Sequence, residues 1–552
     1  MYRKLQYDPI LANPTDWPIV KMYQAKDTFL ESVSNKAVAD ILALEPDTLA
    51  LRKNLAKSLA QGQARLQRMQ WKVDAKDDAS FWAQKIDALN QEHIPLPDLL
   101  KDIALHYAKE IAGGFNVWHY RLVQATASCT LNRLLNPMNP RRLRTLPQIR
   151  AKLQGQIPIL GAINELRQLA RQGTVVMVPT HCSHFDSILI GWVIETLGLP
   201  PFTYGAGLNL FNRQFFAYFM NKLGTYKVDR RKKDVAYLTT LKAYSSLSLH
   251  WGCHSLFYPG GTRSRSGALE NSLKLGLLGT AIDAQQINYQ VYGATAPKLF
   301  IVPVVFNYHF VLEAPFLIRE YLAEREEYVY KPKKDWLNNS YKLLKLIKAF
   351  ATKSSSITVS IGQPMDVLGN KVDGSGSSYD MQGGHIDLYQ YFREKVQGAP
   401  ETEQENKEYT KILGQRIIES YRINNCVLTS CLLAFTAFEL MRNKYANISL
   451  KDFLNLSSSA LTVSYTALEQ AFTEVRKAVL MLEKQGQIRV SEKLKQDTIA
   501  NMIVDGFSNL GLYHHQIPLL RDRSGDITTR DICSLLYYHN RLTGYGLEKY
   551  IE

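Results

Sequence analysis

The stretch Thr174–Asp186 reads TVVMVPTHCSHFD and joins an apolar run to a short polar segment. The run TVVMV is rich in β-branched residues and ends at Pro179, which is typical of a strand inside a sheet. A helix-length apolar segment, Ser187–Leu197, follows it. A strand followed by a polar loop and a helix indicates an α/β fold, in which functional side chains gather where the strands end.

Further apolar runs repeat this pattern along the chain. Cys253–Tyr258, Leu299–Phe306 (LFIVPVVF) and Ile357–Ile361 (ITVSI) each have the length and composition of a strand, and Leu273–Ala284 has the length of a helix. Pro303 lacks an N–H for a sheet ladder and so indicates an edge strand or a bend. The sequence therefore predicts an α/β domain with a mixed sheet flanked by helices.

The two ends of the chain show helical periodicity instead. Leu99–Ala112 and Phe115–Leu135 read as amphipathic helices, and Pro137 and Pro140 follow them. We expect an N-terminal helical region over residues 1–150, the α/β domain over 151–397, and a mainly helical C-terminal region over 398–552. Residues 370–386 are rich in glycine and serine and predict a flexible loop within the α/β domain.

Composition restricts the class of protein. The 552 residues are 46% hydrophobic, which excludes a disordered or collagen-like chain. Six scattered cysteines without a CxxC pair favour a reducing compartment and argue against a structural zinc site. We expect no metal and no bound cofactor. The net charge of +15 suits an anionic partner, whether nucleic acid, an anionic membrane face or a phosphorylated substrate.

No segment predicts a membrane span. The most apolar run, Cys426–Phe438, has 13 residues, whereas a spanning helix needs about 20. The opening residues, MYRKLQYDPILANPTDW, contain no apolar run of the kind found in secretory signals. We expect a protein that lies at the cytoplasmic face of a membrane without crossing it.

The segment HCSHFD carries the first candidate site. His181 follows the strand, and Asp186 lies five positions later, so a turn between them would let the carboxylate orient the imidazole as a base. His184 competes for the same role, and Cys182 is a candidate nucleophile. The alternative is an ordinary helix N-terminus, with His181 or Ser183 as its cap.

A glycine- and arginine-rich segment, YPGGTRSRSG, follows the next strand. Gly260 and Gly261 expose backbone N–H groups, and Arg263 and Arg265 are spaced to bind a phosphate. The alternative is a solvent-exposed turn. A third segment, Gly224–Lys233 (GTYKVDRRKK), is basic, which by itself describes a solvated surface equally well.

Taken in order, these segments resemble the motifs of the glycerolipid acyltransferase superfamily. HCSHFD, GAGLNLF…GTYKVDRR, FYPGGTRSRSG and IVPVVFNY stand where that family has HxxxxD, a G-x-N/basic block, a Gly-rich arginine block and a VPV-type strand. KLGLL and ITVSIGQP continue the likeness, which covers about residues 170–370. The form H-x-S-H-x-D, together with Asn425–Leu428 and Leu536–Asn540, is similar to the glycerol-3-phosphate acyltransferases.

The resemblance implies a reaction and a set of roles. His181 takes the proton of the sn-1 hydroxyl of glycerol 3-phosphate while that oxygen attacks an acyl thioester, from acyl-CoA or an acyl-carrier protein, and Asp186 orients the imidazole. The remaining roles fall to Gly260 and Gly261 (oxyanion), Arg263, Arg265, Lys274 and Arg230 (substrate phosphate), and Asn209, Thr262, Ser264 and Pro303 (acyl chain or motif support). Phe215–Met220 and Ile188–Trp192 are candidates to line the acyl chain.

The sequence departs from the family at one position and leaves other functions open. Gly260 stands where the family commonly has glutamate, and Glu270 is a candidate replacement. Tyr341–Phe350 and Phe115–Leu135 are candidate helices for an anionic membrane surface. The alternatives are a 1-acylglycerol-3-phosphate or other lysolipid acyltransferase, an inactive lipid-binding scaffold, and a winged-helix DNA module at Ala467–Val490. That last helix is poor in unopposed positive charge, so we expect no nucleic-acid partner.

Overall fold

A mixed seven-stranded sheet forms the centre of the computed structural model, which describes residues 7–68, 78–91, 95–135, 146–208, 218, 220–327, 356–396 and 403–551. Its spatial order is β1-β7-β6-β2-β5-β3-β4, and all neighbours are parallel except β6 and β7. The strands are β1 (Ile159–Gly161), β2 (Thr174–Pro179), β3 (Thr203–Gly207), β4 (Thr225–Val228), β5 (Ser255–Leu256), β6 (Leu299–Tyr308) and β7 (Ile357–Ile361). The predicted mixed sheet flanked by helices is confirmed.

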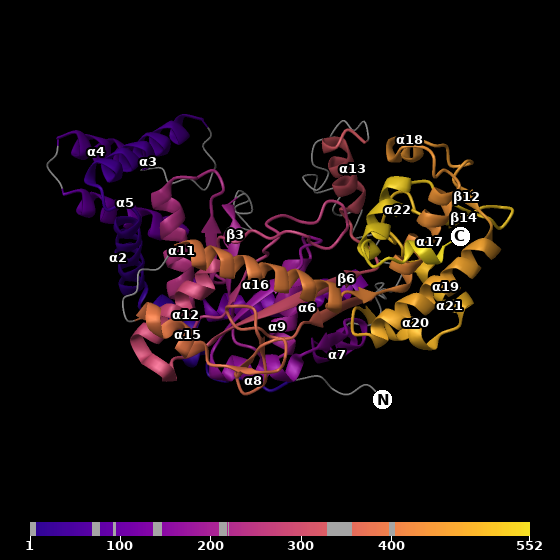
Figure 1. Cartoon of the computed structure of the whole chain (residues 1–552), viewed down its shortest axis with the longest axis horizontal. Coiled ribbons are helices and arrows are strands. Elements are labelled where there is room, and N and C mark those ends of the chain that lie inside the picture. Colours follow the sequence, from indigo (N-terminus) through magenta and orange to yellow (C-terminus); the bar gives the residue numbers. More distant parts are fainter. Residues whose placement is uncertain are drawn as a thin grey trace.

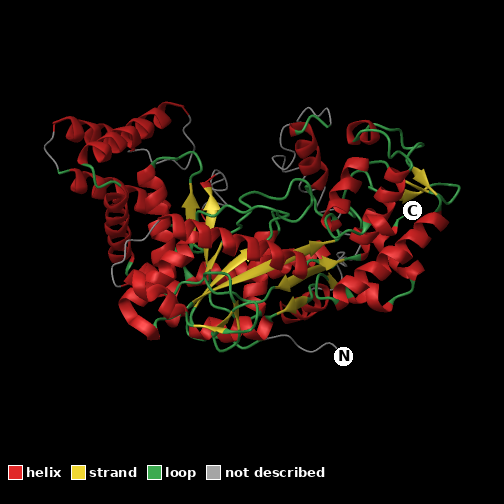
Figure 2. Cartoon of the chain, viewed as in Figure 1, coloured by secondary structure: helices red, strands yellow, loops and turns green. Residues whose placement is uncertain are grey.

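Helical regions stand at both ends of this sheet (Figures 1 and 2). The helices before β2 are α1 (Pro18–Gln24), α2 (Lys26–Leu44), α3 (Thr48–Arg68), α4 (Asp78–Gln91), α5 (Leu96–Ile111), α6 (Val117–Leu135), α7 (Leu146–Gln156) and α8 (Ile163–Gln172). Those between β2 and residue 397 are α9 (Asp186–Thr196), α11 (Val235–His250), α12 (Gly279–Tyr292), α13 (Ala314–Glu324) and α15 (Leu388–Val396). Those of the C-terminal region are α16 (Glu403–Asn424), α17 (Thr429–Asn443), α18 (Leu450–Leu454), α19 (Tyr465–Lys484), α20 (Glu492–Gln496), α21 (Ile499–Asn509) and α22 (Ile532–His539).

Strand β6 corrects the expectation for Pro303. This strand pairs with β2 on one side and β7 on the other, so Pro303 lies inside the sheet and not on an edge strand. Pairing with β7 begins only at Val304, and the Pro303 carbonyl accepts from the Gly362 amide at 2.8 Å. The missing N–H is tolerated because the proline lies just before the antiparallel ladder starts.

The N-terminal helices bury one face against the α/β region. In α5 the buried residues Leu99, Leu100, Ile103 and Tyr107 recur at helical spacing, and the helix packs on α2 and α11. Its sequence pattern predicted this helix within a few residues of its ends. Burial of this apolar face attaches these helices to α11, and α5 also contacts the edge strand β4.

The apolar run Cys426–Phe438 is the core of the C-terminal region. It forms β11 (Cys426–Val427), which pairs with β13 (Arg489–Val490), and then most of α17, and its side chains are buried. A further small sheet has the order β12-β15-β14, with β12 (Thr462–Val463), β14 (Leu520–Arg521) and β15 (Ile527–Thr528). Within the described residues, no helix combines the length and apolar character needed to span a bilayer.

Three further expectations differ from the structure. Residues 370–386, expected to be a flexible loop, contain an antiparallel sheet of β8 (Lys371–Val372), β9 (Ser378–Tyr379) and β10 (His385–Ile386), because Asp373 and Asp380 side chains close its turns. Of Cys253–Tyr258, only β5 is strand. Helix α12 begins at Gly279 and not near Leu273. The domain boundaries stay a prediction.

Candidate active site

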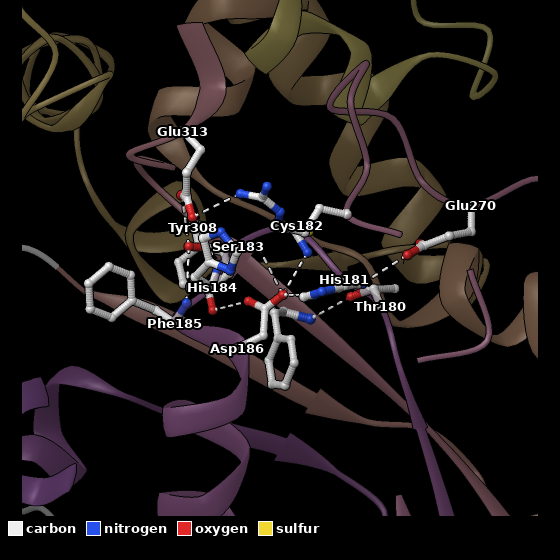
Figure 3. A network of polar contacts seen from close by, with 12 residues as sticks. Thr180, His181, Cys182, Ser183, His184, Phe185, Asp186, Glu270, Tyr308 and Glu313 are labelled. Atoms are coloured by element: carbon white, nitrogen blue, oxygen red, sulfur yellow. Dashed lines mark hydrogen bonds and ion pairs between the residues drawn. The ribbon is translucent and has the colours of Figure 1, made fainter. Parts of the chain in front are cut away.

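The predicted base lies where β2 ends. The Thr180 amide donates to the Val304 carbonyl at 2.9 Å, which extends the contact with β6 one residue beyond Pro179. His181 is the next residue and leaves the sheet, and α9 begins at Asp186. The four residues between them form the turn that the spacing required (Figure 3).

His181 and Asp186 form a hydrogen-bonded pair. The distance between His181 Nδ1 and Asp186 Oδ2 is 2.8 Å, and Oδ2 also accepts the amides of Cys182 at 2.6 Å and Ser183 at 2.9 Å. Because the carboxylate is an acceptor, Nδ1 carries the proton and Nε2 is the nitrogen left to take one. The carboxylate is fully buried, whereas the imidazole is 19% exposed, so the ring reaches solvent while its partner does not. The catalytic roles of this pair stay a prediction.

Two tyrosines that the sequence did not single out complete this arrangement. Tyr308, the last residue of β6, donates its hydroxyl to Asp186 Oδ1 at 2.5 Å. Tyr258, after β5, stacks on the His181 ring, with centroids 4.2 Å apart and planes 23° apart. Both stand at strand C-terminal ends, which is the signal that would have found them.

The structure distinguishes His181 from its neighbours Cys182 and His184. Burial raises the pKa of Cys182 to about 12, so its thiol stays protonated at neutral pH and is a poor nucleophile. Burial, together with the charge of Arg263, lowers the pKa of His184. Asp186 accepts from the His181 ring, which leaves His181 as the oriented imidazole of the segment.

A buried glutamate, Glu313, ties the two candidate segments together. It precedes α13, and its Oε2 accepts from the Ser183 hydroxyl at 3.0 Å. Its Oε1 accepts from the His184 amide at 3.0 Å and from Arg263 Nη1 at 3.2 Å. Sequence reasoning missed Glu313 because it lies in a loop with no motif that marks it.

The two predicted phosphate-binding arginines both meet carboxylates of the α13 segment. Arg263 pairs with Glu313, and Arg265 pairs with Glu324 at the end of α13. Between the arginines, the Ser264 amide donates to the His181 carbonyl at 2.7 Å. The arginine segment is therefore in direct contact with the main chain of His181.

The other two predicted phosphate ligands gather at Gly261. Arg230 donates to the Gly261 carbonyl, and a Cβ built on Gly261 would lie 3.0 Å from Lys274 Cγ. The Gly261 amide donates to the Tyr258 carbonyl at 3.0 Å, in a turn whose φ of +77° suits glycine. That amide is therefore occupied in this structure, and the role of Gly261 as an oxyanion donor stays a prediction. The Gly260 amide makes no hydrogen bond to any described residue.

Glu270 reaches the site from the same loop. Its Oε1 accepts from the His181 amide at 2.8 Å, and burial raises the pKa of its carboxyl. The loop also explains the late start of α12, because the Lys274 amide donates to the Pro259 carbonyl at 2.7 Å and holds the segment in a turn.

Residues of the C-terminal region contact the site. Arg541 is buried, with Nη1 3.7 Å from Cys182 Sγ and Nη2 2.6 Å from the Phe306 carbonyl. Asn540 donates to the Ser266 carbonyl at 2.9 Å. The segment Leu536–Asn540 was quoted only for its resemblance, and no pattern in the sequence indicated these contacts.

The remaining candidates divide into three groups. Asn209, Tyr341–Phe350 and most of Phe215–Met220 lie outside the described residues. Thr262 is exposed, and the Ser264 hydroxyl donates to the Ala268 carbonyl at 2.8 Å. In Ile188–Trp192, the side chains of Leu189, Ile190 and Trp192 are part of the main hydrophobic core, so ordinary packing accounts for them.

One comparison with known proteins bears on this site. Residues 162–307 match the family model described as Acyltransferase. The match runs from the start of α8 to the end of β6 and contains both the His181–Asp186 pair and the arginine segment. It supports the glycerolipid acyltransferase superfamily and a transferase activity, at a level that does not distinguish the members of that superfamily.

Proposed function

We propose that the protein transfers an acyl group from an acyl thioester to the sn-1 hydroxyl of glycerol 3-phosphate, which makes lysophosphatidate for phospholipid synthesis. The observation that carries the proposal is the 2.7 Å hydrogen bond from the Ser264 amide to the His181 carbonyl. This bond holds the segment that contains Arg263 and Arg265 against the main chain of His181. An alcohol that carries a phosphate suits a base with guanidinium groups beside it.

The chemistry follows from the free nitrogen of the imidazole. His181 Nε2 takes the hydroxyl proton while the alcohol oxygen attacks the thioester carbonyl carbon. The tetrahedral intermediate then breaks its C–S bond, and the proton returns from His181 to the departing thiolate. Proton transfer of this kind contributes roughly 10²–10⁴ in rate. Asp186 holds the imidazole tautomer and stabilises the imidazolium that forms.

The substrate phosphate replaces two glutamates as the partner of the arginines. Arg263 and Arg265 turn from Glu313 and Glu324 toward the phosphate, while Arg230 and Lys274 add positive charge beside Gly261. The donor is acyl-CoA or an acyl-carrier protein, and the Gly260 amide is the backbone donor offered to the oxyanion.

We place this reaction at an anionic membrane surface on the cytoplasmic side, with α6 as the contacting helix. Trp118 is 66% exposed and Leu122 is 37% exposed, one helical turn apart, and Arg121 beside them is exposed. An aromatic ring, an aliphatic side chain and a cation on one face suit a lipid interface. Flotation with anionic vesicles tests this, and we expect binding that Trp118→Ala weakens.

The function is tested by thiol release from an acyl thioester. We expect release that depends on glycerol 3-phosphate, that exceeds release with 1-acylglycerol 3-phosphate, and that His181→Ala abolishes. A preference for the lysolipid would identify the other acceptor class. Absence of release with every acceptor and both donor types, with lipid binding retained, would leave a lipid-binding scaffold.

A further inference from the structure

One loop holds the main chain of His181 from both sides. The His181 amide donates to Glu270 Oε1 at 2.8 Å, and the His181 carbonyl accepts from the Ser264 amide at 2.7 Å. Figure 3 shows Glu270 reaching His181 on one side and Asp186 meeting it on the other. The position of the imidazole therefore depends on this loop as well as on Asp186.

The side chain of Glu270 also fills the space beside Gly260. A Cβ built on Gly260 would lie 3.0 Å from Glu270 Cγ and 3.4 Å from Oε1. Gly260 is not among the glycines with positive φ, so its backbone accepts an L side chain once that space is free. A carboxylate at position 260 and a carboxylate at position 270 would thus compete for the same volume.

We infer that Glu270 is a positioning residue for His181, and that its carboxylate has taken the place of a glutamate at position 260. The inference rests on the proposed function for its effect on rate. Without the Glu270 carboxylate, the His181 amide has no hydrogen-bond acceptor beside a part-buried ring. The main chain can then shift and move the imidazole away from the alcohol. Glu270 itself touches the main chain of His181 and not the reacting atoms.

The first test removes the carboxylate that accepts from the His181 amide and then supplies another one. Glu270→Ala is expected to lower kcat about tenfold or more, because small displacements of a catalytic group are costly, and to leave the KM for glycerol 3-phosphate within about twofold, because the arginines remain. Glu270→Gln keeps an amide oxygen in place and is expected to retain most of kcat. Gly260→Glu combined with Glu270→Ala returns a carboxylate to the same space and is expected to recover kcat.

The second test does not depend on activity. Hydrogen–deuterium exchange of a peptide covering residues 177–186 reports on the His181 amide, which is expected to exchange faster in Glu270→Ala and to regain protection in the double variant. Glu419→Ala, on the exposed face of α16, is the matched control and is expected to change neither kcat nor this exchange.

The outcomes separate this inference from the proposed function. A wild-type enzyme that is active, with kcat and exchange unchanged in Glu270→Ala, overturns the role of Glu270 and leaves the function intact. A wild-type protein without acyl transfer overturns the function, and the exchange measurement alone then decides whether Glu270 holds His181. If Glu270→Ala does not fold, Glu270→Gln decides: retained kcat and protection support the hydrogen bond, and loss of both overturns it.

Discussion

The His181–Asp186 pair and the Arg263–Arg265 pair lie next to each other but are held in opposite ways. Asp186 is fully buried and accepts four hydrogen bonds, from the His181 ring, two amides and the Tyr308 hydroxyl. Arg265 is 40% exposed and makes an ion pair with Glu324, which is 58% exposed. The base is fixed before any substrate arrives, whereas Arg265 has an exposed partner that a substrate can replace.

This difference suggests a division of tasks between the two pairs. Fixed groups lower the barrier of the chemical step, because they need no rearrangement when charge develops. The exposed Arg265–Glu324 ion pair contributes about 0–1 kcal/mol, so a phosphate replaces Glu324 at little cost. Variants of the first pair should therefore act on kcat, and variants of the second pair on the KM of the acceptor.

The largest effect is expected at His181. His181→Ala removes the proton acceptor and should lower kcat by about 10³-fold or more, with little change in acceptor KM, as measured by thiol release at saturating donor. Glu419→Ala, on the exposed face of α16, is the control. A variant that keeps more than a tenth of wild-type kcat would mean that another group takes the proton.

Asp186→Asn should have the next largest effect. The amide preserves shape but favours the other imidazole tautomer, which in a related arrangement costs up to about 10⁴ in kcat. Because Asp186 also accepts two main-chain amides, we expect a lower melting temperature as well. Tyr308→Phe removes one donor to the same carboxylate and should show a smaller loss in the same direction.

The arginine variants should change the KM of the acceptor and leave kcat nearly unchanged. Arg263→Lys keeps the charge but loses the planar fork, so acceptor KM should rise about tenfold with kcat nearly unchanged. Arg265→Lys should raise KM less, because its side chain is more exposed than that of Arg263. An equal fall in kcat with unchanged KM would assign the arginines to the chemical step and remove the distinction between the two pairs.

The smallest effect is expected at Cys182. Burial raises the pKa of this thiol to about 12, so the protonated form dominates on the acid side of that value, including neutral pH. Cys182→Ala should retain most activity, and a thiol-alkylating reagent applied between pH 6 and 9 should modify the exposed Cys129 without inactivating the enzyme. Inactivation that tracks modification of Cys182 would favour a covalent acyl-enzyme.

Local pattern was enough to predict the elements that form the centre of the site. TVVMV and ITVSI form β2 and β7, because apolar β-branched runs of this length favour buried strands. The five-residue spacing of His181 and Asp186 predicted the pair once a turn joined them. These features depend on neighbours in the chain.

Features that depend on distant contacts were not predictable in this way. Glu313 and Arg541 reach the site from α13 and from the C-terminal end, and nothing in their own sequence surroundings reports that contact. The glycine–serine composition of residues 370–386 favoured a loop, whereas Asp373 and Asp380 hydrogen bonds order its turns. The Gly261 amide was expected to face a substrate, whereas it donates to the Tyr258 carbonyl within a turn. The sequence alone does not show that hydrogen bond.

The most direct test compares glycerol 3-phosphate with glycerol as acceptors. The quantity is the ratio of their kcat/KM values, measured in the wild-type enzyme and in the Arg263→Lys, Arg265→Lys double variant. If base and arginines act on one phosphorylated alcohol, the ratio falls by about tenfold or more, while turnover of glycerol stays the same. A ratio that does not change between the two enzymes would contradict that claim.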